Sequence, residues 1–184
     1  MAIKPDHQRA DAQLNRAAIL RAAVEALEAS STASLNSIAK RAGVGIGTLY
    51  RHFPTREDLM VEVYRSEVQQ LVELAASLLV RHAPLKALRL WLDRLAELGQ
   101  AKVGLAGVFA TATHDRLNAE TYGPIVGAIE ALLAANRKAG TIRRGVTADE
   151  LLLLLGFLWR IEPSADARAR AKRGLDVIVD GLRS

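Results

Sequence analysis

The sequence predicts an all-α protein of about nine helices, and three observations lead to this fold class. Apolar residues recur three and four positions apart in nearly every segment, which is the spacing of one helix face. No segment alternates between apolar and polar residues as a half-buried strand would. Half of the 184 residues are hydrophobic, while glycine and proline are modest, so the chain can bury a core in one large or two small domains.

The N-terminal helices are marked by local start and stop signals. Residues 14–28 are rich in good helix formers and carry one apolar stripe. Ser34 is a natural N-cap for a short amphipathic helix over 35–42, which Gly43 ends as its C′ residue. A third short helix is expected at 46–52, before Pro54. Thr55 then caps a fourth helix that runs to about Val80.

The remaining chain predicts five more helices. Pro84 opens the first of them and Gly99 breaks it, while Pro124 and Gly140 bracket another. A capping box formed by Thr147 and Glu150 starts a helix that is apolar nearly all round and should be buried on more than one side. The expected ranges are 84–98, 102–113, 122–139, 148–161 and 165–182.

Composition excludes several classes of function. The chain has no cysteine, which excludes disulfides, zinc ribbons and thiol catalysis. No Ser-His-Asp order or paired carboxylates stand out, and the isolated His82 and His114 suggest no metal site, so neither an enzyme nor a cofactor is expected. The N-terminus lacks an apolar signal segment, and the longest apolar run, Leu151–Trp159, is too short to cross a bilayer, so the cytoplasm is the expected compartment.

The stretch GVGIGTLYRHFPTRE, residues 43–57, allows two interpretations. A phosphate-binding loop would need a preceding strand and the pattern GxxxxGK[ST], and neither is present. A helix (35–42), a glycine turn and a second helix (46–52) instead form a helix-turn-helix. An ordinary solvated helical hairpin remains the alternative.

The distribution of charge favours the helix-turn-helix. The formal net charge is +5, and the sequence pI of about 9.9 permits an acidic partner. Of the 25 basic and 20 acidic residues, four bases and no acid lie between Ala29 and Arg56, which leaves 21 bases and 20 acids elsewhere. Most of the positive excess therefore lies in the segment that would approach DNA phosphates.

The same residues carry a resemblance to a known family. Leu35–Tyr64 resembles the DNA-binding domain of TetR-family transcriptional regulators, through the motifs IAKRAGV and GTLYRHF, and the likeness covers about residues 12–71. Gly45 departs from the family pattern, because many members carry a small hydroxyl residue there. The rest of the chain only loosely resembles the family's ligand-binding domains. The resemblance implies a DNA-binding domain over 12–71, with its helix-turn-helix at 34–53, and a ligand-binding and dimerisation domain over 72–184.

The resemblance and side-chain chemistry together suggest the DNA contacts. Tyr50 and His52 match positions that contact backbone phosphates in the family, although His52 could instead be a capping or core residue. Thr48 and Arg51 are the polar side chains best suited to reach bases, but Arg51 could touch phosphate only. The full set of expected DNA contacts is Ser34, Ser37, Gly45, Ile46, Gly47, Thr48, Tyr50, Arg51, His52 and Arg56.

The resemblance implies a homodimeric, ligand-responsive regulator, which in this family is most often a repressor. Such a regulator binds a pseudo-palindromic double-stranded DNA operator and is released from it by a small-molecule inducer, here unknown. The alternatives are an architectural DNA binder without a ligand and a helical protein-interaction module. The expected pocket residues are Trp91, Leu95, Leu105, Phe109, Tyr122, Leu155 and Trp159. The expected dimer contacts are Leu151, Leu158, Leu175, Ile178, Val179 and Leu182.

Overall fold

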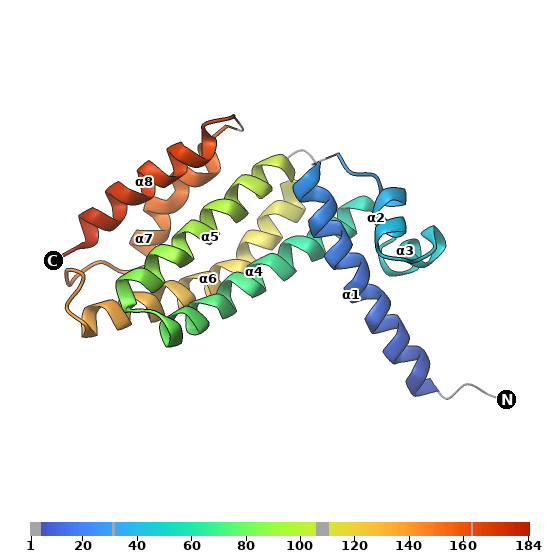
Figure 1. Cartoon of the computed structure of the whole chain (residues 1–184), viewed down its shortest axis with the longest axis horizontal. Helices are drawn as coiled ribbons and strands as arrows, with labels where there is room; N and C mark the ends of the chain where they lie inside the picture. The colour runs from blue at the N-terminus through green and yellow to red at the C-terminus, as the bar shows by residue number, and fades with distance from the viewer. Residues whose placement is uncertain (1–4, 31, 106–110, 163) are drawn as a thin grey trace. The chain divides into compact units, whose positions relative to one another are not determined.

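A computed structural model of the chain describes residues 5–30, 32–105, 111–162 and 164–184. The helix expected at 102–113 lies partly outside these residues. The described residues form eight α-helices and one short 3₁₀ helix, which confirms the all-α class (Figure 1). The chain divides into two compact units between Tyr64 and Arg65, so the long helix α4 contributes to both.

Three helices and the start of α4 build the first unit. Helix α1 spans Pro5–Ala29, α2 spans Leu35–Arg41 and α3 spans Ile46–His52. They pack on one another around an apolar core, because each helix turns one stripe inward. The core side chains in these helices and the α3–α4 turn include Ile19, Ala23, Ile38, Leu49 and Phe53, all nearly inaccessible to solvent.

Helix α4, Arg56–Arg81, begins at the cap that the sequence predicted. The backbone N–H and the hydroxyl of Thr55 donate to the Asp58 carboxylate at 3.0 and 2.7 Å, and the Asp58 N–H donates back to the hydroxyl at 3.1 Å. This reciprocal cap satisfies donors that a helix start leaves without partners. It also fixes where the chain turns after the α3 helix.

Helix α5, Pro84–Leu105, corrects the prediction of a break at Gly99. The helix continues through this glycine, which lies buried against the 3₁₀ helix: a Cβ built on Gly99 would sit 3.6 Å from the Leu158 Cβ. A glycine inside a helix costs about 1 kcal/mol relative to alanine, and burial of the surrounding side chains outweighs this cost. The Trp91 indole N–H, which donates to the Leu71 carbonyl at 2.8 Å, further ties α5 to α4.

Helix α6, Thr111–Lys138, contains Pro124 in its interior, which corrects the predicted helix over 122–139 that begins near this proline. The prediction was wrong because a proline removes one helix hydrogen bond but does not outweigh continuous burial on both sides. Leu117 and Thr121 are buried before Pro124, and Ile125 and Ile129 are buried after it. The same face of the helix therefore packs into the core across the proline.

Helix α7, Ala148–Leu155, starts with the predicted capping box. The Thr147 N–H donates to the Glu150 carboxylate at 2.8 Å, and the Glu150 N–H donates to the Thr147 hydroxyl at 3.2 Å. The chain then tightens into the 3₁₀ helix η1, Gly156–Arg160, instead of continuing as one helix to 161. The expectation of burial on several sides was also wrong, since Leu153 and Leu154 are 80% and 55% exposed.

Helix α8, Ala167–Leu182, packs on α5. Gly174 allows close packing with η1, because a Cβ at this position would lie 2.4 Å from Cε2 of the Phe157 ring. After α8, Arg183 pairs with Ile142 in an isolated antiparallel bridge, a contact that the helical pattern did not predict. Within the described part of the chain, no helix is long and apolar enough to cross a membrane.

Candidate nucleic-acid interface

The turn between α2 and α3 is fixed by its backbone. The Gly43 N–H donates to the Lys40 carbonyl at 3.2 Å and the Val44 N–H donates to the Ala39 carbonyl at 3.1 Å, which is the pattern of a Schellman motif. Gly43 has a φ of 70°, a value that L-residues with side chains rarely adopt. The glycine predicted to end this helix therefore sets the angle at which α3 leaves α2.

Two serines at the start of α2 are joined to each other. The Ser34 hydroxyl accepts a hydrogen bond from the Ser37 N–H at 3.1 Å, and the Ser37 hydroxyl donates to the Ser34 carbonyl at 2.7 Å. Both residues are exposed. The predicted N-cap is confirmed, and it leaves the exposed serine oxygens with acceptor capacity toward solvent.

Helix α3 has two distinct faces. Leu49, together with Phe53 at the C-cap, is buried in the unit's core, as their apolar spacing predicted. Tyr50 is 48% exposed and Ile46 is 38% exposed on the same short helix. Arg51 is exposed and makes no hydrogen bond or ion pair with any described residue. The outer face therefore offers one aromatic hydroxyl, one guanidinium and one apolar side chain to a partner.

Thr48 and His52 are half-buried on the same helix. The His52 ring lies 6.3 Å from the Phe53 ring, centroid to centroid, and tilted by 47°. The Phe53 ring in turn lies under the Arg16 guanidinium, 5.3 Å from ring centroid to Cζ. These contacts hold the end of α3 against α1.

Gly45 and Gly47 leave part of this face as bare backbone. Gly45 is the N-cap of α3, and it supplies no side-chain cap, as expected from its departure from the family pattern. A Cβ built on either glycine would meet nothing within 4 Å, and neither has a positive φ. The packing and backbone geometry of the chain itself therefore do not require glycine at these two positions.

The basic residues around α3 differ in how many contacts they make within the chain. The Arg56 guanidinium donates to the Ala33 carbonyl, so this residue also links the start of α4 to the loop before α2. Arg41 forms an exposed ion pair with Glu25 at 3.3 Å. Lys40 is exposed on α2 and was not among the predicted DNA contacts. Its position in the segment without acidic residues is the signal by which it could have been predicted as a contact.

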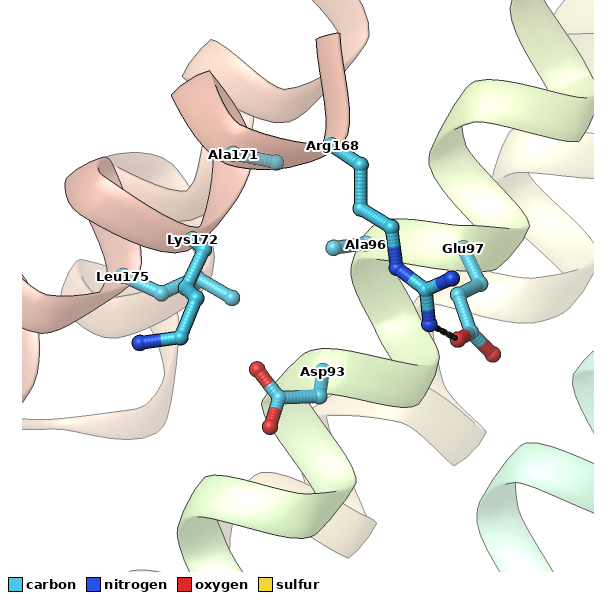
Figure 2. Close-up of a pocket in the computed structure, with 7 residues that line it drawn as sticks. All are labelled: Asp93, Ala96, Glu97, Arg168, Ala171, Lys172 and Leu175. Atoms are coloured by element: carbon cyan, nitrogen blue, oxygen red, sulfur yellow. Dashed lines mark hydrogen bonds and ion pairs between the residues drawn. The ribbon is translucent and has the colours of Figure 1, made fainter. Parts of the chain in front are cut away.

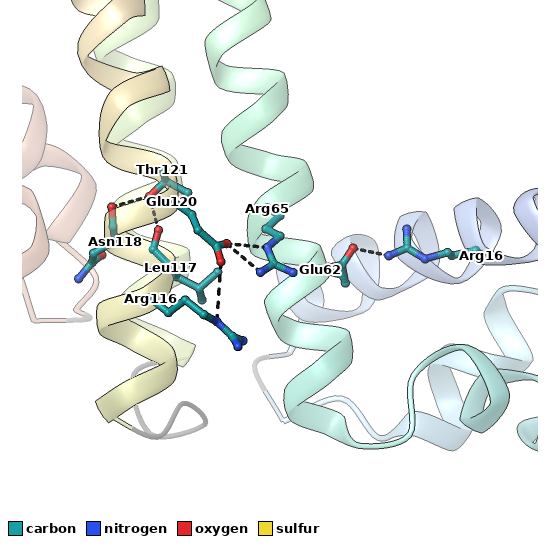
Figure 3. Close-up of polar contacts among 8 residues, drawn as sticks. All are labelled: Arg16, Glu62, Arg65, Arg116, Leu117, Asn118, Glu120 and Thr121. Carbon is teal, nitrogen blue, oxygen red and sulfur yellow. Dashed lines mark hydrogen bonds and ion pairs between the residues drawn. The ribbon is translucent and has the colours of Figure 1, made fainter.

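Helix α4 carries charged side chains that anchor it in each unit (Figure 3). In the first unit, Glu62 pairs with Arg16 of α1. In the second unit, the Arg65 guanidinium donates twice to one oxygen of Glu120 on α6, at 3.0 and 2.7 Å. Arg116 approaches the other Glu120 oxygen at 3.8 Å. Helix α4 is therefore held by ion pairs on both sides of the boundary between units.

The side chains predicted to line a pocket lie in different environments. Trp91, Leu95 and Leu155 are fully buried core residues, and Trp159 is half-buried near Gly99. Leu105 and Phe109 fall outside the residues whose side chains the structure describes. The complete burial of Trp91, Leu95 and Leu155 supports a core role for these three side chains.

Tyr122 is 51% exposed, and its hydroxyl donates to the Asp149 carboxylate. This hydrogen bond, with smaller effects from desolvation and from the charge of Asp149, raises the pKa of Tyr122 above its ordinary value. The contact links α6 to α7.

The residues predicted to form a dimer contact are mostly covered by other parts of the same chain. Leu175 is fully buried, and Val179 and Leu182 are 7% and 4% exposed. This apolar stripe is covered because α8 packs on α5. Leu151 and Leu158 are buried too, while Ile178 is half-buried.

Comparison with known proteins identifies the family. Residues 19–63 match the model of bacterial regulatory proteins of the tetR family, and residues 83–184 match the transcriptional regulator SbtR-like C-terminal domain. The second match alone covers more than half of the chain. The chain belongs to the TetR family. It is therefore a DNA-binding transcriptional regulator of a non-enzymatic family.

Solved structures and a curated protein support this assignment. The TetR transcriptional regulator SCO0520 from Streptomyces coelicolor is 38% identical, with a TM-score of 0.78 over 91% of this chain and 98% of that one. The TetR regulatory protein from Mycobacterium vanbaalenii is 31% identical, with a TM-score of 0.72 over 96% and 99% of the two chains. The curated HTH-type transcriptional regulator SAR0097 from Staphylococcus aureus is 39% identical over 67 residues, which is 35% of each protein.

Proposed function

We propose that this TetR-family regulator is a homodimeric repressor that binds a pseudo-palindromic operator and leaves it when a small-molecule inducer binds. In this proposal residues 12–71 bind DNA, with the helix-turn-helix at 34–53, and residues 72–184 bind the ligand and form the dimer. The observation that carries the proposal is the outer face of α3, where exposed Tyr50 and Arg51 lie in a segment without acidic residues.

The proposed DNA contacts divide into two kinds. Tyr50, His52 and the serines Ser34 and Ser37 offer hydroxyl or ring donors suited to phosphate oxygens, which position the protein without reading sequence. Arg51 can donate two hydrogen bonds to a guanine edge in the major groove, and Ile46 can contact a thymine methyl group. Thr48 stands beside them as a further base contact. Gly45 and Gly47 allow the backbone of α3 to approach the groove closely.

We place the dimer contact on the outer faces of α7 and α8. Leu153, Leu154 and Val177 are 80%, 55% and 74% exposed, and large apolar side chains left exposed on these two helices would be covered by a protein contact. Ile178 and Gly181 lie next to Val177 along the α8 face. A two-fold contact through this face would cover it with its own copy and supply two recognition helices.

The inducer part of the proposal rests on membership of the family, since regulators of this family are often ligand-responsive. Release from DNA requires the ligand to favour the conformation that does not bind DNA. A 100-fold preference corresponds to a coupling free energy of about 2.7 kcal/mol.

Two experiments test the proposal. Selection from a pool of random duplexes identifies the preferred DNA sequence, and fluorescence anisotropy then measures the affinity of the protein for it. We expect a pseudo-palindrome with half-sites one or more helical turns apart, about 34–36 Å per turn. Light scattering on the complex should give two chains per duplex. Equal affinity for unrelated duplexes would favour an architectural DNA binder, and absence of salt-sensitive binding would favour a protein-interaction module.

A further inference from the structure

A hollow of about 300 Å³ lies between α5 and α8 in the second unit (Figure 2). This volume is at the lower end of the range for small-molecule pockets, about 300–1,000 Å³. The hollow is lined by Ala96, Ala171 and Leu175 together with four charged side chains, and none of these residues was among the predicted pocket residues.

The floor of the hollow is formed by buried apolar side chains. Leu175 is fully buried, and Ala96 and Ala171 are 6% and 2% exposed. Alanine has the smallest side chain that still favours a helix, so one alanine on each of the two helices leaves space between them. The floor can therefore accept a short apolar body.

The walls carry charges of opposite sign. Asp93 and Glu97 come from α5, while Arg168 and Lys172 come from α8 (Figure 2). The two helices therefore present two carboxylates on one side and two cations on the other.

These charged groups already have partners, but the pairs are exposed. Arg168 pairs with Glu97 at 2.9 Å and is 83% exposed, and Lys172 pairs with Asp176 at 3.3 Å and is 68% exposed. Asp93 contacts Arg89 at 3.5 Å, and Arg89 keeps Asp176 as a second partner if this contact opens. Exposed ion pairs contribute little to stability, so a ligand's own charges can replace them at small cost.

We propose that this hollow binds a small dipolar molecule that carries an ammonium and a carboxylate group at opposite ends of a short apolar body. The carboxylate faces Arg168 and Lys172, the ammonium faces Asp93 and Glu97, and the apolar body lies on the alanine and leucine floor. The Arg168 guanidinium lies 2.9 Å from the Glu97 carboxylate, so the ligand enters by separating this exposed pair and offering one charge to each wall. A dipeptide carries an ammonium and a carboxylate group on a short apolar body, and therefore has one group for each wall. The proposal does not depend on the operator or the inducer mechanism.

Isothermal titration calorimetry on the full chain without DNA tests this site with three matched probes. Alanyl-leucine carries both charges, N-acetyl-alanyl-leucine only the negative one, and alanyl-leucinamide only the positive one. We expect the dipeptide to bind about ten-fold more tightly than either derivative, because each derivative loses charge-assisted hydrogen bonds on one wall.

Variants assign the binding to the hollow. The double variant Arg168→Ala/Lys172→Ala should weaken dipeptide binding about ten-fold and should no longer distinguish the dipeptide from its amide. Arg170→Ala/Arg173→Ala is the matched control, since it removes two cations from exposed positions of α8 that do not line the hollow. Circular dichroism melting checks that both variants are folded.

Any one of three results would overturn the proposal. The first is that the wild-type chain shows no saturable dipeptide binding. The second is that the Arg168→Ala/Lys172→Ala variant still prefers the dipeptide to its amide, and the third is that the control variant loses as much dipeptide binding as this double variant. Because no DNA is present, none of these results depends on whether the proposed repressor function is correct.

Discussion

Replacing Gly47 with alanine separates the needs of the fold from those of DNA binding. Gly47 lies in the first turn of α3 with an ordinary helical backbone, and a Cβ there would meet nothing within 4 Å. The Gly47→Ala change should therefore stabilise the free protein by up to about 1 kcal/mol, the usual difference between the two residues in a helix. The same methyl group would stand between the α3 backbone and the DNA groove.

Overpacking of a closely fitted contact costs about 1–3 kcal/mol. Because 1.4 kcal/mol is a ten-fold change, operator affinity should fall about ten-fold or more per half-site. Gly127→Ala is the matched control, since Gly127 is an exposed helical glycine in α6 that also has nothing within 4 Å of a built Cβ. Urea unfolding should show stabilisation in both variants, and fluorescence anisotropy should show weaker operator binding only for Gly47→Ala. Unchanged operator affinity for Gly47→Ala would refute close approach of the α3 backbone to DNA.

Three further changes test the second unit. Gly174→Ala places a methyl group 2.4 Å from the Phe157 ring and should cost about 1–3 kcal/mol in urea unfolding, and unchanged stability would contradict the packing of η1 on α8. Hydrogen bonds from the backbone and hydroxyl of Thr147 lower the pKa of Glu150 from its ordinary value of 4.5. The ionised Glu150 carboxylate therefore stabilises the fold fully above pH 4.5, and this stabilisation is lost as the pH falls through the lowered pKa of the folded protein. Between pH 6 and 3, unfolding measurements should show a smaller loss of stability for Glu150→Gln than for the wild type, and equal losses would contradict the capping role. Val177→Arg should give a folded monomer by light scattering, since it places a charge in the proposed dimer contact, and a folded dimer would locate the contact elsewhere.

Sequence alone predicted the features that depend on neighbouring residues. The caps at Ser34, Thr55 and Thr147 each use a side chain that bonds to a backbone N–H three residues along the chain, so no tertiary information is needed. Gly43 ended its helix for an equally local reason, its positive φ. Local residues are therefore sufficient to locate the turn that orients the recognition helix.

Features that depend on distant contacts were missed. Gly99 and Pro124 weaken helices locally, but α5 and α6 continue through both because the helix faces around them are buried in the second unit's core. On α8, the stripe at Leu175 and Val179 was recognised as apolar, but its spacing could not show whether α5 or a second subunit covers it. Exposed Val177 lies about 200° around the helix from Leu175, and only the structure shows which face remains open.

The exposed face of α3 is the central element of the proposed function, and the operator affinity of Arg51→Ala tests it most directly. Fluorescence anisotropy would compare wild type and variant on the selected operator and on a scrambled duplex of equal length at one salt concentration. We predict that the wild type binds the operator at least about 10³-fold more tightly than the scrambled duplex, and that Arg51→Ala loses about 1–3 kcal/mol per half-site on the operator alone. Equal wild-type affinity for the two duplexes, or an Arg51→Ala variant that keeps full operator affinity, would contradict sequence recognition through this face.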